Sequence, residues 1–152
     1  MPVYKSIADS IHKYIEIPKK IYVDLIDTAP FQRLRRLGQL GGVHASYPSA
    51  THSRFIHSLG AFHIANRIVT SLKKKRPELV SKDVEERILI SALIHDIGHG
   101  PFSHMFEDAI KMLCNKSELQ SCVDKYSSFR RHENITEQFV LSEESEISRI
   151  LD

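Results

Sequence analysis

The strongest constraint on the fold is the apolar run at 88–94, "ILISALI", which follows a helix start signal. Ser81 can cap the helix. Three acidic residues in the next turn stabilise it further, because their negative charge lies near the positive end of the helix dipole. Because apolar residues occur on every side of this helix, we predict that it is central and buried. Its C-terminal end then carries His95 and Asp96 into the interior.

The other segments predict a mostly α helical bundle with a small N-terminal β-hairpin. Short β-prone runs at 3–7 and 14–17 flank a polar turn, as in a hairpin. Helical spacing or start and stop signals then appear in several stretches, separated by loops at 41–51 and 115–131. The expected helices cover 19–28, 30–40, 59–75, 102–113, 132–141 and 143–151.

Length and charge exclude several classes of protein. The 152 residues suffice for a single domain, 1–152, and the net charge of +2 is too small to indicate a membrane or nucleic-acid partner. No apolar run approaches the ~20 residues that span a bilayer, and no secretory signal is visible. Cys114 and Cys122 are therefore expected to be free thiols, and the location cytoplasmic or nuclear.

The pair His95–Asp96 is unusual at the end of a buried helix, because a carboxylate there faces the negative end of the dipole. A divalent cation would compensate this charge and accept neutral imidazole, and His57 on another predicted helix is the natural third ligand. Such a set suits Zn, Fe, Mn or Co, and Mg also remains a candidate. The metal would activate water for hydrolysis of a phosphoester or phosphoanhydride.

The alternative is that these histidines merely line a packed core, since a His–Asp pair often arises by chance. His12, His44 and His63 are expected to be surface or packing residues of this kind, and His52 has no assigned role. The runs "HSRFIHSLG" and "HDIGHGPFSH" differ, because their glycines and proline allow the backbone to approach closely. We therefore favour a metal site.

Four stretches carry a resemblance to a known family: "DSIHKYIEI", "LIDTAPFQRLRRLGQLGGVHASYPSATHSRFIHSLG", "LIHDIGHGPFSHMFE" and "RRHENIT". Together they resemble the HD-domain phosphohydrolases, and within them the deoxynucleoside triphosphate triphosphohydrolases of the SAM-and-HD-domain type. The resemblance extends over roughly residues 3–140 in the family's order.

The resemblance implies an HD-domain bundle that hydrolyses dNTPs to deoxynucleoside and triphosphate. It also implies a divalent metal ion, assembly of identical chains, and a GTP or dGTP effector. Glu107 stands where the relatives usually have aspartate. The implied residues are His57, His95 and Asp96 for the metal; His104, Glu107, His132 and His99 for catalysis; Arg54, Gln39 and Leu40 for the substrate; and Asp27, Gln32 and Arg35 for the effector.

Two features leave the function open. The family's fourth metal ligand is an aspartate on a later helix, and the chain ends at Asp152 before such a helix. It is therefore either a piece of an enzyme or a catalytically incomplete protein that binds nucleotide or regulates a full-length relative. In addition, the arginines at 33, 35 and 36 can be interpreted as solvating a helix rather than binding an effector.

Overall fold

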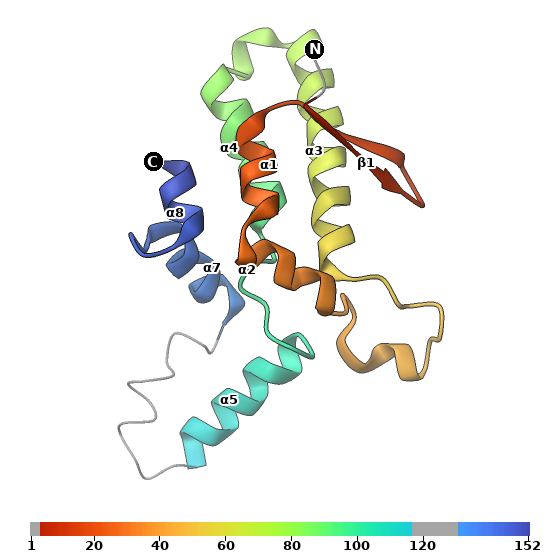
Figure 1. Cartoon of the computed structure of the whole chain (residues 1–152), viewed down its shortest axis with the longest axis vertical. Coiled ribbons are helices and arrows are strands. Elements are labelled where there is room, and N and C mark those ends of the chain that lie inside the picture. Colours follow the sequence, from red (N-terminus) through yellow and green to blue (C-terminus); the bar gives the residue numbers. More distant parts are fainter. Residues whose placement is uncertain (1–3, 117–130) are drawn as a thin grey trace.

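The computed structural model describes residues 4–116 and 131–152, and these are mostly helical with one N-terminal hairpin (Figure 1). This confirms the predicted fold class. Of the expected loop at 115–131, residues 117–130 lie outside the described residues, as do Cys122 and the side chain of Cys114, whereas residues 115 and 116 belong to a helix. Across the part that is described, no helix is both long and apolar enough to cross a membrane.

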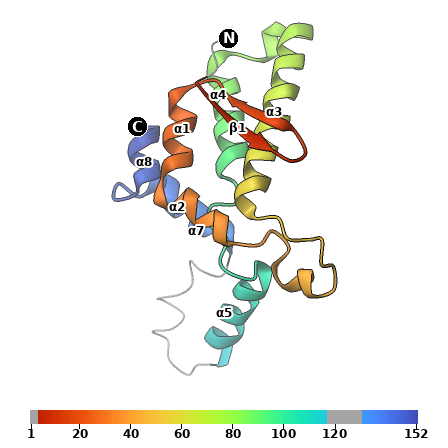
Figure 2. The same ribbon diagram turned by 45° about the vertical axis from the view of Figure 1, so that its right-hand side comes forward.

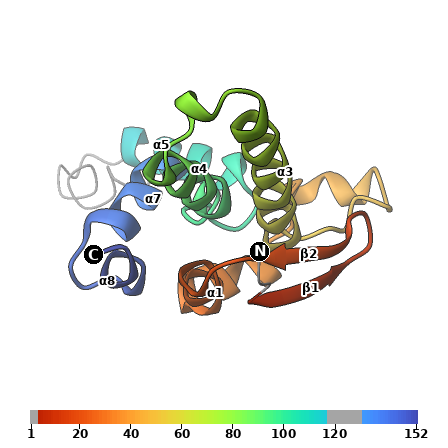
Figure 3. The ribbon, with the colours of Figure 1, turned by 90° about the horizontal axis from the view of Figure 1, so that it is seen from above.

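The hairpin pairs β1 (Lys5–Asp9) with β2 (Lys13–Ile17) in antiparallel register. Asp9 Oδ1 accepts hydrogen bonds from the backbone N–H groups of Ile11 and His12, at 2.9 and 2.7 Å, which fixes the turn. Ile15 and Ile17 are fully buried, so one face of β2 joins the core. Figures 2 and 3 show the hairpin alongside α3 (Arg54–Lys75).

The segment after the hairpin is broken more than its sequence predicts. Helix α1 (Lys20–Asp27) is followed by a single turn, α2 (Ala29–Gln32), and a 3₁₀ turn, η1 (Arg33–Arg36). The predicted helix over 30–40 is therefore wrong beyond residue 36. At Leu37 the backbone becomes extended, Gly38 pairs with Ser53, and the short turn η2 (Gly41–Ala45) follows.

Helices α3 and α4 (Lys82–Ile94) pack side by side, joined by the short turn η3 (Pro77–Leu79). Phe62, Leu89 and Leu93 are buried between them and α1 in one apolar core. Helix α4 is not buried on all sides as predicted, because Ile88 remains 39% exposed. The core therefore covers one face of α4 and leaves the opposite face open among the described residues.

The last helices have different environments. Helix α8 (Glu146–Leu151) packs against α1 through the fully buried Ile147, and α7 (His132–Leu141) connects to it. Helix α5 (His104–Lys116) projects away from the bundle (Figures 1 and 2). The predicted apolar stripe of α5 is largely uncovered by the described residues, since Met105 and Leu113 are 61% and 62% exposed.

Replacing Ser81 with alanine is expected to lower the free energy of unfolding by about 1 kcal/mol. The Ser81 hydroxyl caps α4 by accepting the Val84 N–H at 3.2 Å, as predicted, and alanine leaves that N–H without its partner. Urea unfolding followed by circular dichroism measures the difference. Ser71→Ala, a change within α3, is the control that should leave stability within about 0.5 kcal/mol; equal stability of both variants would contradict a capping role.

Candidate metal centre and adjoining pocket

Three predicted metal ligands converge where two helices meet. His57 lies in the first turn of α3, and His95 and Asp96 follow the last residue of α4. The two Nε2 atoms of His57 and His95 are 3.2 Å apart. The carboxylate oxygens of Asp96 lie 3.3 Å from His95 Nε2 and 3.8 Å from His57 Nε2. These atoms all lie within 4.8 Å of one another, close enough to hold one ion.

The protonation of the two imidazoles suits a cation. His95 Nδ1 lies 3.0 Å from the Ala92 carbonyl oxygen, which can only accept, so Nδ1 acts as the donor and Nε2 faces His57 and Asp96. Burial lowers the pKa of His57 despite the opposing charge of Asp96. Two imidazoles and one carboxylate form a donor set for Zn, Fe, Mn or Co, so these residues fit the implied metal.

Asp96 already has one counter-ion, Arg54, the first residue of α3. Its Nη1 donates to Asp96 Oδ2 at 2.5 Å, and both side chains are almost fully buried. Burial by itself raises the pKa of Asp96, but His95 and Arg54 outweigh it and hold that pKa below its usual value. Asp96 is therefore a carboxylate at neutral pH even without a metal.

Arg54 also joins two other segments to the site. Its Nη2 donates to Ser103 Oγ at 2.7 Å and to the Gln39 carbonyl at 3.3 Å. Phe102 and Ser103 both have positive φ, 61° and 56°, a conformation that costs about 1–2 kcal/mol per residue. Strain of this kind is commonly retained where a side chain has to be held in place for function. Ser103 carried no prediction of its own.

The four predicted catalytic residues form a second group around one carboxylate. Glu107, 6% exposed, lies in the first turn of α5. Its Oε1 is 2.9 Å from His132 Nδ1, 3.4 Å from His104 Nδ1 and 4.0 Å from His99 Nδ1. The rings of His99 and His132 stack with centroids 3.7 Å apart. Both groups adjoin, because His99 Nε2 is 3.6 Å from Asp96 Oδ1.

Within this group, burial and charge determine protonation. Burial, aided by Arg54 and His132, lowers the pKa of His99 to about 4, so its ring is neutral at physiological pH. Burial raises the pKa of Glu107, but hydrogen bonds from His132 and His104 outweigh it, and the net shift is downward. The group therefore combines a buried neutral imidazole with an ionised carboxylate that two other histidines approach.

A cavity of about 510 Å³ lies between the two groups. This volume is within the usual range for small-molecule sites, about 300–1,000 Å³. The predicted substrate residues and three of the four predicted catalytic residues line it, together with one metal ligand. Its lining residues are Gln39, Leu40, Arg54, Asp96, His99, Ser103, His104 and His132.

The predicted effector residues are held by contacts with neighbouring groups of the bundle. Asp27 is half exposed and pairs with Lys5 at 3.2 Å. Gln32 Nε2 donates to the Ile26 carbonyl, while its Oε1 accepts from Arg35 Nε at 2.7 Å. The Arg35 guanidinium lies over the buried Phe55 ring, and this contact holds the side chain in place. The effector role of these residues stays a prediction.

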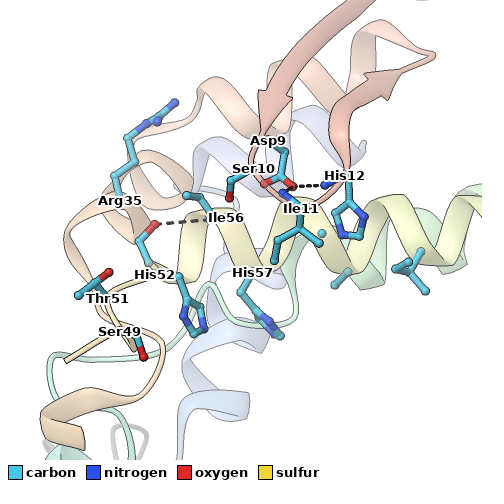
Figure 4. Close-up of a pocket in the computed structure, with 14 residues that line it drawn as sticks. Asp9, Ser10, Ile11, His12, Arg35, Ser49, Thr51, His52, Ile56 and His57 are labelled. Atoms are coloured by element: carbon cyan, nitrogen blue, oxygen red, sulfur yellow. Dashed lines mark hydrogen bonds between the residues drawn. The ribbon is translucent and has the colours of Figure 1, made fainter. Parts of the chain in front are cut away.

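Arg35 instead lines a second, larger cavity of about 1000 Å³. Figure 4 shows it between the hairpin turn that carries His12 and the side chains of His52 and His57. His52, to which the sequence assigns no role, is thus beside a predicted metal ligand. His12 contacts His63 with ring centroids 4.7 Å apart, which agrees with a packing role; the side chain of His44 lies outside the described residues.

Two positioning residues carried no functional prediction. Arg33 donates to the carbonyl oxygens of Ile97 and His99, at 2.7 and 2.9 Å, and so fixes the turn that bears His99. Thr136 Oγ1 accepts the Gly98 N–H at 3.1 Å, which ties α7 to the same turn. The interpretation of Arg33 as a solvating charge is wrong, because its guanidinium is bound to these carbonyls.

Replacing Gly98 with alanine is expected to destabilise the protein by about 2–3 kcal/mol. A Cβ there would lie 2.0 Å from the His132 carbonyl oxygen and 2.6 Å from Thr136 N, so the backbone of α7 would have to move. Thermal unfolding measures the loss. Gly42→Ala, where a Cβ meets nothing within 4 Å, is the matched control; a Gly98 variant as stable as that control would rule out close packing of α7.

Comparison with known proteins matches the same region. The family model "HD domain" matches residues 54–151, well over half of the chain. The chain is 48% identical to the uncharacterized protein YwfO of Bacillus subtilis over 103 residues, 68% of this chain and 24% of that protein. It is 46% identical over 110 residues to the Dictyostelium discoideum deoxynucleoside triphosphate triphosphohydrolase SAMHD1 homolog, covering 72% and 21%.

The Homo sapiens deoxynucleoside triphosphate triphosphohydrolase SAMHD1 is 48% identical over 107 residues, 68% of this chain and 16% of that protein. The matched region thus spans about a sixth to a quarter of these relatives. The family match contains the three converging ligands and all four residues of the second group. This confirms the resemblance seen in the sequence, and the chain belongs to the HD domain family.

Proposed function

We propose that the chain carries the active-site core of a metal-dependent phosphohydrolase that cleaves dNTPs to deoxynucleoside and triphosphate. The observation that carries the proposal is that Asp96 belongs at once to the three-ligand group and to the wall of the 510 Å³ cavity. A phosphate in that cavity would be in reach of both a cation and the histidine group. The names of the SAMHD1 relatives support dNTPs as the substrate class.

The metal would be held by His57, His95 and Asp96, with its identity among Zn, Fe, Mn and Mg left to experiment. When bound, a divalent cation stabilises the charge on the reacting phosphate and lowers the pKa of water. Arg54 lies on the cavity wall, and its buried Nε has no hydrogen-bond partner among the described residues. This free donor supports a role for Arg54 in binding a phosphate oxygen.

The proposed reaction is attack of water on the α-phosphorus. The new bond joins the water oxygen to phosphorus, and the bond from phosphorus to the sugar's 5′-oxygen breaks. A neutral His99 can take the proton from water, and His104 can give a proton to the leaving 5′-oxygen. Glu107, 3.4 Å from His104 Nδ1, would stabilise the charged imidazolium and orient its ring. Gln39 and Leu40 would contact sugar and base.

The proposal includes a guanine nucleotide effector, GTP or dGTP, near Asp27, Gln32 and Arg35, and assembly of identical chains. The fixed position of Arg35, which stacks on a ring and donates to Gln32, supports an effector site. Asp27 does not add to that support, because it pairs with Lys5. Light scattering with and without GTP tests both points together. A mass that does not change with GTP would remove the effector from the proposal.

The proposed activity is tested by incubating the metal-depleted protein, reloaded with Mn²⁺ or Mg²⁺, with each dNTP. Formation of deoxynucleoside and inorganic triphosphate is expected. If the gene encodes residues after Asp152, the longer polypeptide should be tested in parallel, so that any further ligand is supplied. If both well-folded, metal-loaded proteins leave dNTPs intact, the proposed activity is wrong.

A second candidate function is a non-catalytic partner of a longer relative. The exposed apolar side chains of α5, such as Met105 and Leu113, favour it because they offer a surface for another chain. Formation of a mixed complex by a chain that is inactive alone would support this alternative. A chain that stays monomeric and hydrolyses dNTPs would exclude it.

A further inference from the structure

The residues assigned to proton transfer have a second chemical capability. Three imidazole Nδ1 atoms surround one oxygen of Glu107, at 2.9 Å (His132), 3.4 Å (His104) and 4.0 Å (His99). In this cluster, the ligand atoms of His99, Glu107 and His132 all lie within 4.8 Å of one another. Two imidazole nitrogens and a carboxylate oxygen are the ligands that Zn²⁺ and similar ions take in proteins.

One atom of this group lacks a partner. His99 is 3% exposed, and its Nδ1 has no hydrogen-bond partner among the described residues, although it lies 4.0 Å from Glu107 Oε1. A buried polar nitrogen left unpaired is destabilising, because it loses its hydrogen bond with water and gains none in the protein. A cation between His99 Nδ1 and Glu107 Oε1 would satisfy this nitrogen, whereas a direct hydrogen bond at 4.0 Å cannot.

The spacing fits an ion after a small movement. Tetrahedral ligands at about 2.0–2.1 Å from Zn²⁺ are about 3.3 Å from one another. The two separations to Glu107 Oε1, 2.9 and 4.0 Å, lie on either side of that value. The stacked rings of His99 and His132 must open so that both planes point at the ion. His132, the first residue of α7, has a side chain that is 17% exposed, so it is not enclosed on every side.

We propose that His99, Glu107 and His132 form a second cation site, selective for Zn²⁺ or Co²⁺ over Mg²⁺ and Ca²⁺. The selectivity follows from the nitrogen ligands, because Mg²⁺ and Ca²⁺ prefer all-oxygen sites. The site is separate from the group around His95, since it uses the other nitrogen of the His99 ring from the one facing Asp96. His104, 70% exposed and 3.4 Å from Glu107, can approach as a further ligand.

An ion at this site would inhibit. It would occupy the lone pairs of His99 and His132 and the charge of Glu107, which then could not exchange protons with substrate. Excess Zn²⁺ should therefore suppress hydrolysis that Mn²⁺ at the first site supports. This consequence rests on the proposed function, but binding of the ion does not.

The test is the number of ions bound by the full chain. Metal-depleted protein is dialysed against Zn²⁺ or Co²⁺, and bound metal is measured by elemental analysis, with circular dichroism to verify folding. We expect two ions per wild-type chain, and one for either Glu107→Gln or His57→Ala. Because two sites account for the count, the double variant should bind none. Asp108→Asn, an exposed acid beside Glu107 on α5, is the matched control and should keep two.

The affinity of the second site should fall by more than about 100-fold in Glu107→Gln, since loss of even an outer partner of a ligand costs about 10–100-fold. His132→Asn, at a partly exposed position, provides an independent variant if Glu107→Gln is poorly folded. A Glu107→Gln variant that binds as many ions as the wild type would overturn the proposal. These counts are read without any hydrolysis assay, so they separate failure of this site from failure of the proposed activity.

Discussion

Replacing Arg54 with alanine is expected to lower the free energy of unfolding of the metal-free protein by about 3–5 kcal/mol. Both Arg54 and Asp96 are almost fully buried, and their ion pair at 2.5 Å is the closest contact of the Asp96 carboxylate with a permanent cation. Without the guanidinium, a buried charge is left uncompensated, and Ser103 and the Gln39 carbonyl each lose a donor. For a protein of this size the melting temperature should fall by about 6–20 °C.

A divalent cation should restore part of this loss, because it would supply Asp96 with the charge that Arg54 no longer provides. The increase in melting temperature on adding Mn²⁺ should therefore be larger in Arg54→Ala than in the wild type. Arg36→Ala, an exposed arginine in the neighbouring 3₁₀ turn, is the matched control and should change stability by less than about 0.5 kcal/mol. An Arg54 variant that behaves like this control would contradict the buried pair.

Asp96 also shows what the sequence could predict and what it could not. The cost of a carboxylate at the end of α4 is visible in the sequence, and it indicates a compensating cation. In the structure Arg54 supplies that charge from 42 positions earlier in the chain. Local reasoning cannot identify this partner, because the pairing depends on how α3 packs against α4.

The same distinction holds for the fold. The start of α4 at Ser81 and the hairpin depend on local signals, and the sequence predicts both. The break at Leu37 does not follow from such signals, since Gly38 leaves the helical path to pair with Ser53. The role of Arg33 was missed for a similar reason. The sequence does not distinguish it from the neighbouring arginines, because the carbonyls that it binds belong to a turn more than 60 residues away.

Replacing His95 with alanine should reduce kcat/KM for dNTP hydrolysis by about 1000-fold or more while barely changing stability. Each factor of ten corresponds to about 1.4 kcal/mol, so the loss is about 4 kcal/mol of transition-state stabilisation. The side chain of His95 is 40% exposed, so its removal leaves no buried cavity. Without it, two ligands remain for the metal, and bound metal should fall with activity.

The measurement combines elemental analysis, urea unfolding and the dNTP assay on one preparation. His63→Ala is the matched control, because His63 lies further along α3 and contacts His12 rather than the metal group. It should retain metal, stability and turnover. A large loss of stability in His95→Ala would assign a structural role to this residue, whereas undiminished turnover would exclude the three-ligand group from the reaction. Loss of metal and turnover with unchanged stability would show that His95 acts as a metal ligand and not as a structural residue, because in the proposed reaction His95 acts on the phosphate only through the metal.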